Sequence, residues 1–243
     1  MMKRRFVACG WRRIHAAFRP QFVVDRASAC VRRLQLPPVS SVAAQCRLEA
    51  FDIAAAALGL VALAVPMGVI AVLVRATSRG PALFRQERMG RGGRTFVVRK
   101  FRTMSAGHGD PSTVTVRGDA RVTGVGRFLR RFKLDEFPQL WNVFVGEMSL
   151  VGPRPDVPAY YERLGAEARR ILELRPGITG PATLKYANEE ELLAAQADPV
   201  KYNDEVIFPD KVRLNLAYLE QVTFGGDVGW IWKTAAAAFR KRT

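Results

Sequence analysis

The strongest constraint on the fold is the run from Ile53 to Val74, which has no charged residue and is overwhelmingly apolar. At about 1.5 Å per residue, a helix of this length would span the roughly 30 Å hydrocarbon core of a bilayer. Pro66 stands near the middle of the run, where it removes a helical hydrogen bond and favours a kink. The sequence therefore predicts a membrane-inserted helix that is broken at proline.

The charges beside the apolar run bear on its topology. Arg47 precedes the run, and Arg75, Arg79 and Arg85 follow it. A spanning helix normally has one flank poorer in Lys and Arg, because positive residues stay on the inner side. Basic flanks at both ends favour a re-entrant helix that enters, bends and returns to the same face. A single spanning helix remains an alternative, and a buried helix of a soluble protein fits the length less well.

Three regions follow from this pattern. Residues 1–47 form a basic extension without the continuous apolar core of a signal peptide. We expect this extension to be disordered, with a basic amphipathic surface helix over 3–18 as the alternative. Residues 48–79 form the membrane segment, and residues 80–243 form the remaining domain.

The excess of positive charge is concentrated just after the apolar run. The chain has a net charge of +16, and residues 75–133 alone hold fifteen basic and three acidic residues. Cations beside an apolar segment favour anionic lipid headgroups or phosphorylated substrates, so we expect no nucleic-acid partner.

Cysteine and histidine are scarce. Cys9, Cys30 and Cys46 are odd in number and show no disulfide framework, which favours a reducing compartment. His15 and His108 are the only histidines, so a Ser-His-Asp site or a His-rich zinc site is improbable. Acid–base chemistry must then fall to carboxylates or lysines.

The domain after the membrane segment reads as α+β and mostly helical. Residues 82–88 and 95–101 resemble two strands joined by a glycine-rich turn, which predicts a small β-hairpin. These glycines lack the Gly-Lys-Ser/Thr ending of a P-loop, so they do not indicate a nucleotide cradle. Further helices are expected over 124–133, 159–174, 189–197 and 210–222, with an amphipathic interfacial helix at the C-terminus around Trp230 and Trp232.

One more helix is expected to begin at Pro138, shortly after a pair of acidic residues, since proline suits the first helical turn. Its apolar residues recur at helical spacing, in the order Phe137, Leu140, Trp141 and Phe144. We interpret this stripe as core packing.

An acidic pair, Asp135-Glu136, stands between a run of cations and the rigid loop Gly152-Pro-Arg-Pro155. Carboxylates held among fixed cations suit chemistry on phosphates, where the protein positions groups and neutralises charge. The alternative for an acidic pair is a purely structural one, in which it begins a helix and pairs with Arg130 or Arg131.

Several strings of this chain occur together in one family. FRQERMG, KFRTM, RFLRRFKLDEFPQLWNVFVGEMSLVGPRP and RPGITG follow one another in that order, after an apolar segment broken by proline. On these motifs, residues 48–240 resemble the bacterial sugar transferases, also called monotopic phosphoglycosyl transferases. Residues 1–47 lie outside the resemblance.

The resemblance implies an enzyme of the inner membrane whose catalytic domain, residues 80–243, faces the cytoplasm. Such enzymes transfer a sugar-1-phosphate from a nucleotide diphosphate sugar, here expected to be a UDP-sugar, to a polyprenyl phosphate such as undecaprenyl phosphate, with Mg²⁺ as cofactor. The products are a polyprenyl-diphosphate-sugar and a nucleoside monophosphate. This reaction begins the synthesis of exopolysaccharide, capsule, O-antigen (lipopolysaccharide) or another glycoconjugate. The protein is expected to contact membrane phospholipids. Whether it forms a homodimer is left open.

The resemblance also assigns roles to residues. Asp135 corresponds to the nucleophile and magnesium ligand, and Glu136 to its acid–base partner. The expected phosphate-binding residues are Arg130, Arg154, Lys100, Arg102 and Arg88. For Arg88 a lipid-headgroup or structural role is an equal alternative, and for Arg154 a structural role in the loop stays open.

One stretch departs from the pattern of many members. After RPGITG the chain continues Pro181-Ala-Thr-Leu-Lys185-Tyr186, so sugar contacts are not transferred to this loop. Lys185, Tyr186 and Asn188 stay candidates for the sugar. Glu189, Glu190 and Glu191 are expected on a solvated helix face.

Two other classes of function compete with the transferase. A membrane-anchored protein that binds polyanions would need clustered cations and aromatic residues but no fixed carboxylate pair. A structural or assembly partner would use the same fold without turnover.

Overall fold

The computed structural model of the chain describes residues 42–105, 115 and 118–240. The surface helix expected over 3–18 and most of the polar loop after residue 105 lie outside these residues. The described part combines many short helices with a small antiparallel sheet, which confirms the expected mixed and mostly helical fold.

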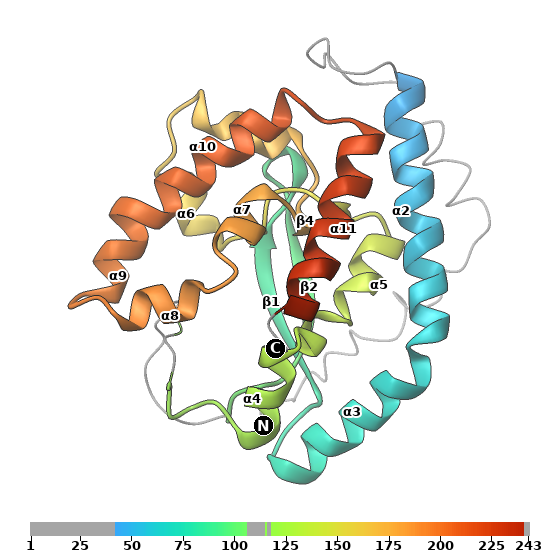
Figure 1. Cartoon of the computed structure of the whole chain (residues 1–243), viewed down its shortest axis with the longest axis vertical. Coiled ribbons are helices and arrows are strands. Elements are labelled where there is room, and N and C mark those ends of the chain that lie inside the picture. Colours follow the sequence, from blue (N-terminus) through green and yellow to red (C-terminus); the bar gives the residue numbers. More distant parts are fainter. Residues whose placement is uncertain (1–41, 106–114, 116–117, 241–243) are drawn as a thin grey trace, which may run out of the picture. The chain divides into compact units, whose positions relative to one another are not determined.

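The apolar run forms two helices that meet at a bend. Helix α2 covers Val42–Ala62, helix α3 covers Ala64–Thr77, and the two are bent by 62° (Figure 1). Pro66 explains the position of the break. It has no backbone N–H to donate to the carbonyl of Ala62, and its ring clashes with that carbonyl. Among the described residues no single helix is both long enough and apolar enough to cross a bilayer. The two helices of the bent pair reach that length and hydropathy together, a result that rests on length and composition only.

The predicted hairpin is confirmed. Strands β1 (Leu83–Met89) and β2 (Thr95–Phe101) pair antiparallel, with Leu83 opposite Phe101. The turn between them contains the 3-10 helix η2 (Arg91–Gly93), in which Gly92 and Gly93 have φ values of 68° and 73°. Glycine adopts these angles without steric cost, which is why the turn is rich in glycine.

Three short elements follow the hairpin: helix α4 (Gly124–Arg131), the 3-10 turn η3 (Leu134–Glu136) and helix α5 (Gln139–Phe144). Helix α5 packs between α2 and β2 (Figure 1). The buried amide of Asn142 fixes this contact, since it donates to Val97 O at 2.7 Å and accepts from Arg99 N at 3.2 Å.

A second pair of strands was not expected from the sequence. Strand β3 (Ser149–Val151) and strand β4 (Gly177–Thr179) run parallel. Gly152 and Gly177 lie so close that a Cβ on either would collide with the backbone of the other segment. The pairing therefore brings the strings SLVGPRP and RPGITG side by side.

The helix expected over 159–174 is wrong as a single element. The structure has helix α6 (Pro158–Glu162) and the 3-10 helix η4 (Ala168–Glu173), with Gly165 between them. Glycine disfavours a continuous helix at this point.

The rest of the domain is helical. It comprises α7 (Pro181–Lys185), α8 (Glu189–Ala194), α9 (Pro199–Tyr202), the π-helical segment η5 (Asn203–Ile207), α10 (Phe208–Leu219) and α11 (Phe224–Arg240).

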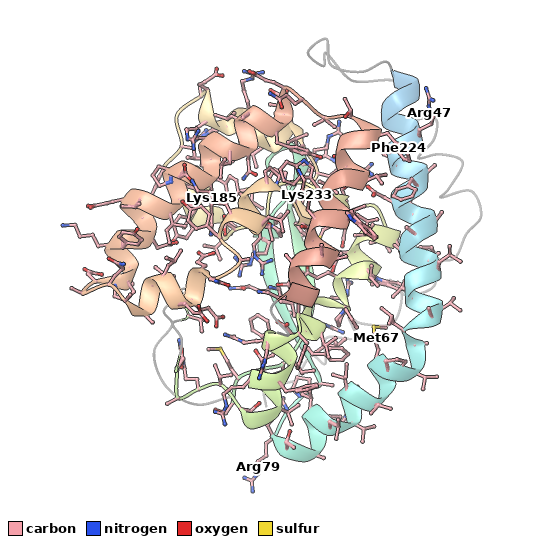
Figure 2. The ribbon with its side chains drawn as sticks, in the orientation of Figure 1. Arg47, Met67, Arg79, Lys185, Phe224 and Lys233 are labelled. Atoms are coloured by element: carbon pink, nitrogen blue, oxygen red, sulfur yellow. The ribbon has the colours of Figure 1, made fainter. Side chains whose placement is uncertain are left out.

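The bent helix pair is attached to the rest of the domain by polar and aromatic contacts. Ser149 Oγ donates to Asp52 Oδ2 of α2 at 2.6 Å. The rings of Phe51 and Phe224 meet edge to face at 5.3 Å, where the start of α11 reaches α2 (Figure 2). Helix α3 contributes Ile70 and Val74 to a core cluster with Phe101 and Leu129.

The apolar stripe of α5 is only partly in the core, which corrects the expectation. Leu140 packs against the cluster of Ala56, Val98, Val143 and Met148, and Phe137 packs against the neighbouring cluster. Trp141 and Phe144, however, are 42% and 39% exposed. Since α5 has only six residues and turns one face to α2 and β2, the other face remains uncovered.

Candidate active site

The acidic pair lies on η3, between helices α4 and α5. Thr123 caps α4 by accepting from Gly126 N at 2.9 Å. A Cβ at Gly126 would collide with the backbone of Thr103, so α4 packs directly against the end of the hairpin. The carboxylates of Asp135 and Glu136 are thereby placed beside β2, and both residues are buried.

Glu136 is enclosed by two cations. Both terminal nitrogens of Arg154 donate to its carboxylate, Nη2 to Oε1 and Nη1 to Oε2, the latter at 3.3 Å. Lys100 Nζ donates to Oε1 at 3.2 Å. Burial alone would raise the pKa of Glu136, but the charges of Arg154 and Lys100 outweigh it and hold the pKa well below its usual range. Glu136 is therefore ionised at neutral pH.

Asp135 has a different environment although it is the next residue. Its Oδ1 atom is buried and accepts no hydrogen bond from the described residues. Burial, and then the negative charge of Glu136, raise the pKa of Asp135 above its ordinary value. An unpartnered buried carboxylate oxygen is unfavourable in the folded protein, and buried groups of this kind are concentrated at sites that bind a ligand or react.

Arg154 is held in place by its loop. Gly152 N donates to Thr179 O, and Gly177 N donates to Pro153 O, each at 2.8 Å. Pro153 and Pro155 restrict the backbone on both sides of the arginine. A guanidinium fixed in this way can meet a carboxylate or a phosphate with little further loss of entropy. The predicted loop cation is therefore brought to the acidic pair.

Lys100 reaches the pair from β2. Its burial is the main reason that its pKa falls to about 8, and the nearby Glu136 opposes that fall. The residue consequently keeps a positive charge at neutral pH and loses it in mildly alkaline solution.

Arg88 lies at the edge of this group. Its Nη2 donates to Gln86 Oε1 at 2.6 Å, and its Nη1 to Pro155 O at 3.4 Å. Burial lowers the pKa of Arg88, whereas Asp156 raises it. Asp156 is a buried acid that the sequence interpretation did not include. Burial raises its pKa, and the charges of Lys211 and Arg88 lower the pKa by less. Its position directly after the Gly-Pro-Arg-Pro loop was the signal that could have identified it.

Arg130 and Arg102 are placed differently. Arg130 donates from Nε to Thr103 Oγ1 at 2.9 Å and from Nη1 to Glu190 Oε1 at 3.0 Å, and its charge acts on Asp135. Arg102 is buried and donates from Nη2 to Ser78 O at 2.7 Å and to Ser78 Oγ at 2.8 Å. The structure thus joins Arg102 to the end of α3 rather than to the acidic pair.

The polar residues after β4 bind one another. Lys185 Nζ and Tyr186 Oη both donate to Asp210 Oδ2 at 2.7 Å. Lys211 Nζ donates to both carboxylate oxygens of Glu189, at 2.7 and 2.8 Å. The expectation of a purely solvated face is therefore wrong for Glu189, because α10 covers its carboxylate.

Among the described residues, no group of three or more His, Cys, Asp or Glu side chains could hold a metal ion. Mg²⁺ does not require such a group, because it is often bound by one or two carboxylates together with substrate phosphates and water. The free Oδ1 of Asp135 fits such an arrangement.

Comparison with known proteins agrees with this geometry. A family model described as bacterial sugar transferase matches residues 44–241. The chain belongs to the bacterial sugar transferase family. The match contains the acidic pair and all but the first two residues of the bent helix pair, so the family assignment covers both.

Curated members of the family are similar to long stretches of this chain. A UDP-glucose:undecaprenyl-phosphate glucose-1-phosphate transferase of Caulobacter vibrioides is 46% identical over 153 residues, which cover 61% of this chain and 57% of the relative. The enzyme of the same name from Klebsiella pneumoniae is 36% identical over 185 residues, covering 74% and 39%. A UDP-N-acetylgalactosamine-undecaprenyl-phosphate N-acetylgalactosaminephosphotransferase of Aeromonas hydrophila is 35% identical over 191 residues, covering 75% and 41%.

The aligned stretches span 57% of the length of the first of these relatives and about two fifths of the other two. The names of these three relatives share undecaprenyl phosphate and a UDP-sugar, and the sugar is glucose in two of them and N-acetylgalactosamine in the third.

Proposed function

We propose that this protein transfers a sugar-1-phosphate from a UDP-sugar to undecaprenyl phosphate or a related polyprenyl phosphate. The observation that carries the proposal is the contrast within the acidic pair: Glu136 is bound by Arg154 and Lys100, while Asp135 Oδ1 has no partner in the described part of the chain. One carboxylate thus orders the cations, and the other is free to react. The names of the relatives support the same donor and acceptor classes.

In the first step an oxygen of the Asp135 carboxylate attacks the β-phosphorus of the donor. The bond between that phosphorus and the bridging oxygen breaks, and the nucleoside monophosphate leaves with the oxygen. A phosphosugar–aspartyl intermediate remains on Asp135. Arg154 and Lys100, which both donate to the Glu136 carboxylate, can neutralise the phosphate charge in this step. Asp135 would hold Mg²⁺, and the bound ion would supply further neutralisation of phosphate charge.

In the second step a phosphate oxygen of the lipid attacks the same phosphorus. The bond to the Asp135 oxygen breaks, the carboxylate is restored, and the polyprenyl-diphosphate-sugar is released. Division into two steps means that the two anionic substrates need not react with each other directly.

The role of Glu136 in acid–base chemistry stays a prediction. A carboxylate whose pKa lies well below its usual range accepts a proton poorly near neutral pH. Its contacts support a positioning role, in which Glu136 holds the nitrogen atoms of Arg154 and Lys100 beside Asp135.

We also propose that the protein is monotopic in the inner membrane and faces the cytoplasm. The bent pair α2–α3 carries exposed apolar side chains along both arms, among them Leu58, Val61, Val65 and Val72. Arg47 and Arg79 lie at opposite ends of the pair (Figure 2). Because positive residues stay on the inner side of a membrane, a cation at each end suits a pair whose two ends lie at the same surface. Trp141 and Phe144 of α5 would contact the lipid beside the site.

The direct test uses purified protein with Mg²⁺, polyprenyl phosphate and a panel of UDP-sugars. Release of nucleoside monophosphate is measured, and the enzyme is quenched during turnover for mass spectrometry. A phosphosugar adduct is expected on Asp135. Asp135→Asn should abolish both turnover and adduct while membrane association remains, and the exposed control Glu205→Gln should behave as wild type. Turnover by Asp135→Asn, or an unmodified Asp135 in an enzyme that is turning over, would disprove the mechanism.

A further inference from the structure

Lys133 has an unusual backbone conformation for its residue type. It is the one non-glycine residue with a positive φ in the part of the chain that the structure describes, with φ 56° and ψ 22°. This left-handed conformation is unfavourable for a residue with a Cβ, and the position after a helix is usually taken by glycine or asparagine. A lysine here lowers stability relative to glycine, which suggests that its side chain is needed.

The strained residue is the link between α4 and the acidic pair. Lys133 N donates to Arg130 O at 3.2 Å, and Lys133 O accepts from Glu136 N at 3.3 Å. The left-handed turn therefore sets the direction in which η3 leaves the helix. A glycine could make the same turn, so the backbone alone does not explain the lysine.

The side chain of Lys133 is exposed, unlike those of the other cations near the pair. Its ammonium makes no hydrogen bond or ion pair with a residue in the described ranges, although its charge acts on both Asp135 and Glu136. Lys100 and Arg154, by contrast, are bound to Glu136. Lys133 is thus the cation beside the pair that is free to receive an incoming anion.

We propose that the Lys133 ammonium binds a phosphate oxygen of an anionic substrate at Asp135 and positions it for reaction. The inference rests on the proposed function and adds a substrate contact to it. The phosphate can belong to the donor diphosphate or to the polyprenyl phosphate, and the two half-reactions distinguish these sources.

Three variants separate charge from backbone strain. Lys133→Gly removes the charge and relieves the strain, Lys133→Met removes the charge but keeps the strain, and Lys133→Arg keeps both. We expect Lys133→Gly to melt at a higher temperature than wild type and still to lose activity. Lys201→Met, a charge deletion at an exposed lysine of α9, serves as the control and should leave turnover unchanged.

The two half-reactions are measured in turn. Nucleoside monophosphate release is followed in a single turnover without lipid, and polyprenyl phosphate is then added to discharge the enzyme. Loss of one charged hydrogen bond should slow the affected step about tenfold or more in Lys133→Gly and Lys133→Met, with a raised KM for the substrate concerned. Lys133→Arg should stay within about threefold of wild type, since a cation is retained. A slower first step assigns the donor diphosphate, and a slower second step assigns the lipid phosphate.

The inference fails if both steps of Lys133→Gly and Lys133→Met stay within about twofold of wild type. It also fails if Lys133→Arg is as slow as Lys133→Met, because a lost charge would then not be the cause. Absence of turnover in the wild-type enzyme with every donor would instead refute the proposed function and, with it, this inference.

Discussion

Arg154 binds Glu136 through both of its terminal nitrogens, and this ion pair joins the Gly-Pro-Arg-Pro loop to the turn that carries Asp135. The pair is buried on the Glu136 side and partly open on the Arg154 side, with side-chain exposures of 9% and 30%. The guanidinium can therefore keep its contact with Glu136 and still present nitrogen atoms to a phosphate.

Arg154→Lys should be nearly as harmful as removal of the side chain. A lysine retains the charge but cannot donate two parallel hydrogen bonds to Glu136, so the carboxylate and the approaching phosphate would compete for one ammonium. We expect a loss of about 100-fold in kcat/KM, measured by nucleoside monophosphate release. Arg163→Lys, at an arginine that is mostly exposed on its side chain, is the matched control and should have little effect. Near wild-type turnover in Arg154→Lys would argue against a bidentate role.

Asp135→Asn should be inactive and yet more stable than wild type at neutral pH. Because the fold raises the pKa of Asp135, the native state binds the proton more tightly than the unfolded state. The contribution of Asp135 to stability therefore falls as pH rises from its ordinary pKa through the raised value. Replacement of the buried charge should add about 1–2 kcal/mol to the free energy of unfolding near pH 7.

Urea denaturation of the detergent-solubilised protein measures this difference. The advantage of Asp135→Asn should shrink when the pH is lowered below the ordinary range of aspartate, because Asp135 is then protonated in both states. An asparagine variant that is less stable at pH 7 would show that Asp135 has a stabilising partner.

The dependence of kcat/KM on pH should be bell-shaped. On the acid side, activity requires ionised Asp135, so the lower limb should lie above the ordinary aspartate range. On the alkaline side, Lys100 loses its positive charge as pH rises through about 8, and its hold on phosphate is lost with it. Lys100→Met should be slow at every pH and should lack this alkaline limb. An unchanged upper limb in Lys100→Met would assign that pKa to another group.

The exposed aromatic residues of α5 should strengthen membrane binding. Trp141→Ser combined with Phe144→Ser is expected to weaken binding to vesicles that contain anionic lipid by about tenfold, because two amphipathic or apolar rings no longer enter the interface. The control is Leu192→Ser on α8, where a leucine is exposed to the same 42% as Trp141. Flotation of the variants with vesicles measures the difference, and equal loss in the control would remove the special role of α5.

Both ends of the bent helix pair should be accessible from the same side of the membrane. Single cysteines at Arg47 and Arg79, in a protein whose native cysteines are replaced by serine, can be treated with a membrane-impermeant thiol reagent in sealed inverted vesicles. A re-entrant pair gives labelling of both positions from the cytoplasmic side. Labelling of only one position, with the other accessible after the vesicles are opened, would show a spanning helix.

The sequence indicated much of the site because its residues are close together in the chain or within short motifs. Asp135, Glu136 and Arg154 fall within one continuous string, and Lys100 lies on a strand whose alternation was visible. Arg102 belongs to the same short motif as Lys100, yet it binds Ser78 at the end of α3. Residues two positions apart in a strand point to the same side, so the motif places Arg102 with Lys100, but β2 ends at Phe101 and Arg102 lies just beyond it.

The sequence by itself predicted that an uncharged apolar run breaks near Pro66 and that a hairpin follows, and it places residues 44–241 in the bacterial sugar transferase family. These features depend on local chemistry: proline without an N–H, glycine in a tight turn, and short motifs in order. Only the tertiary structure decided which carboxylate is bound and which is free. The parallel pairing of β3 with β4 brings Arg154 to Glu136, whereas Asp135 Oδ1 has no partner among the described residues. Contacts of this kind join segments that are far apart in the sequence, so they arise from tertiary packing and no local pattern encodes them.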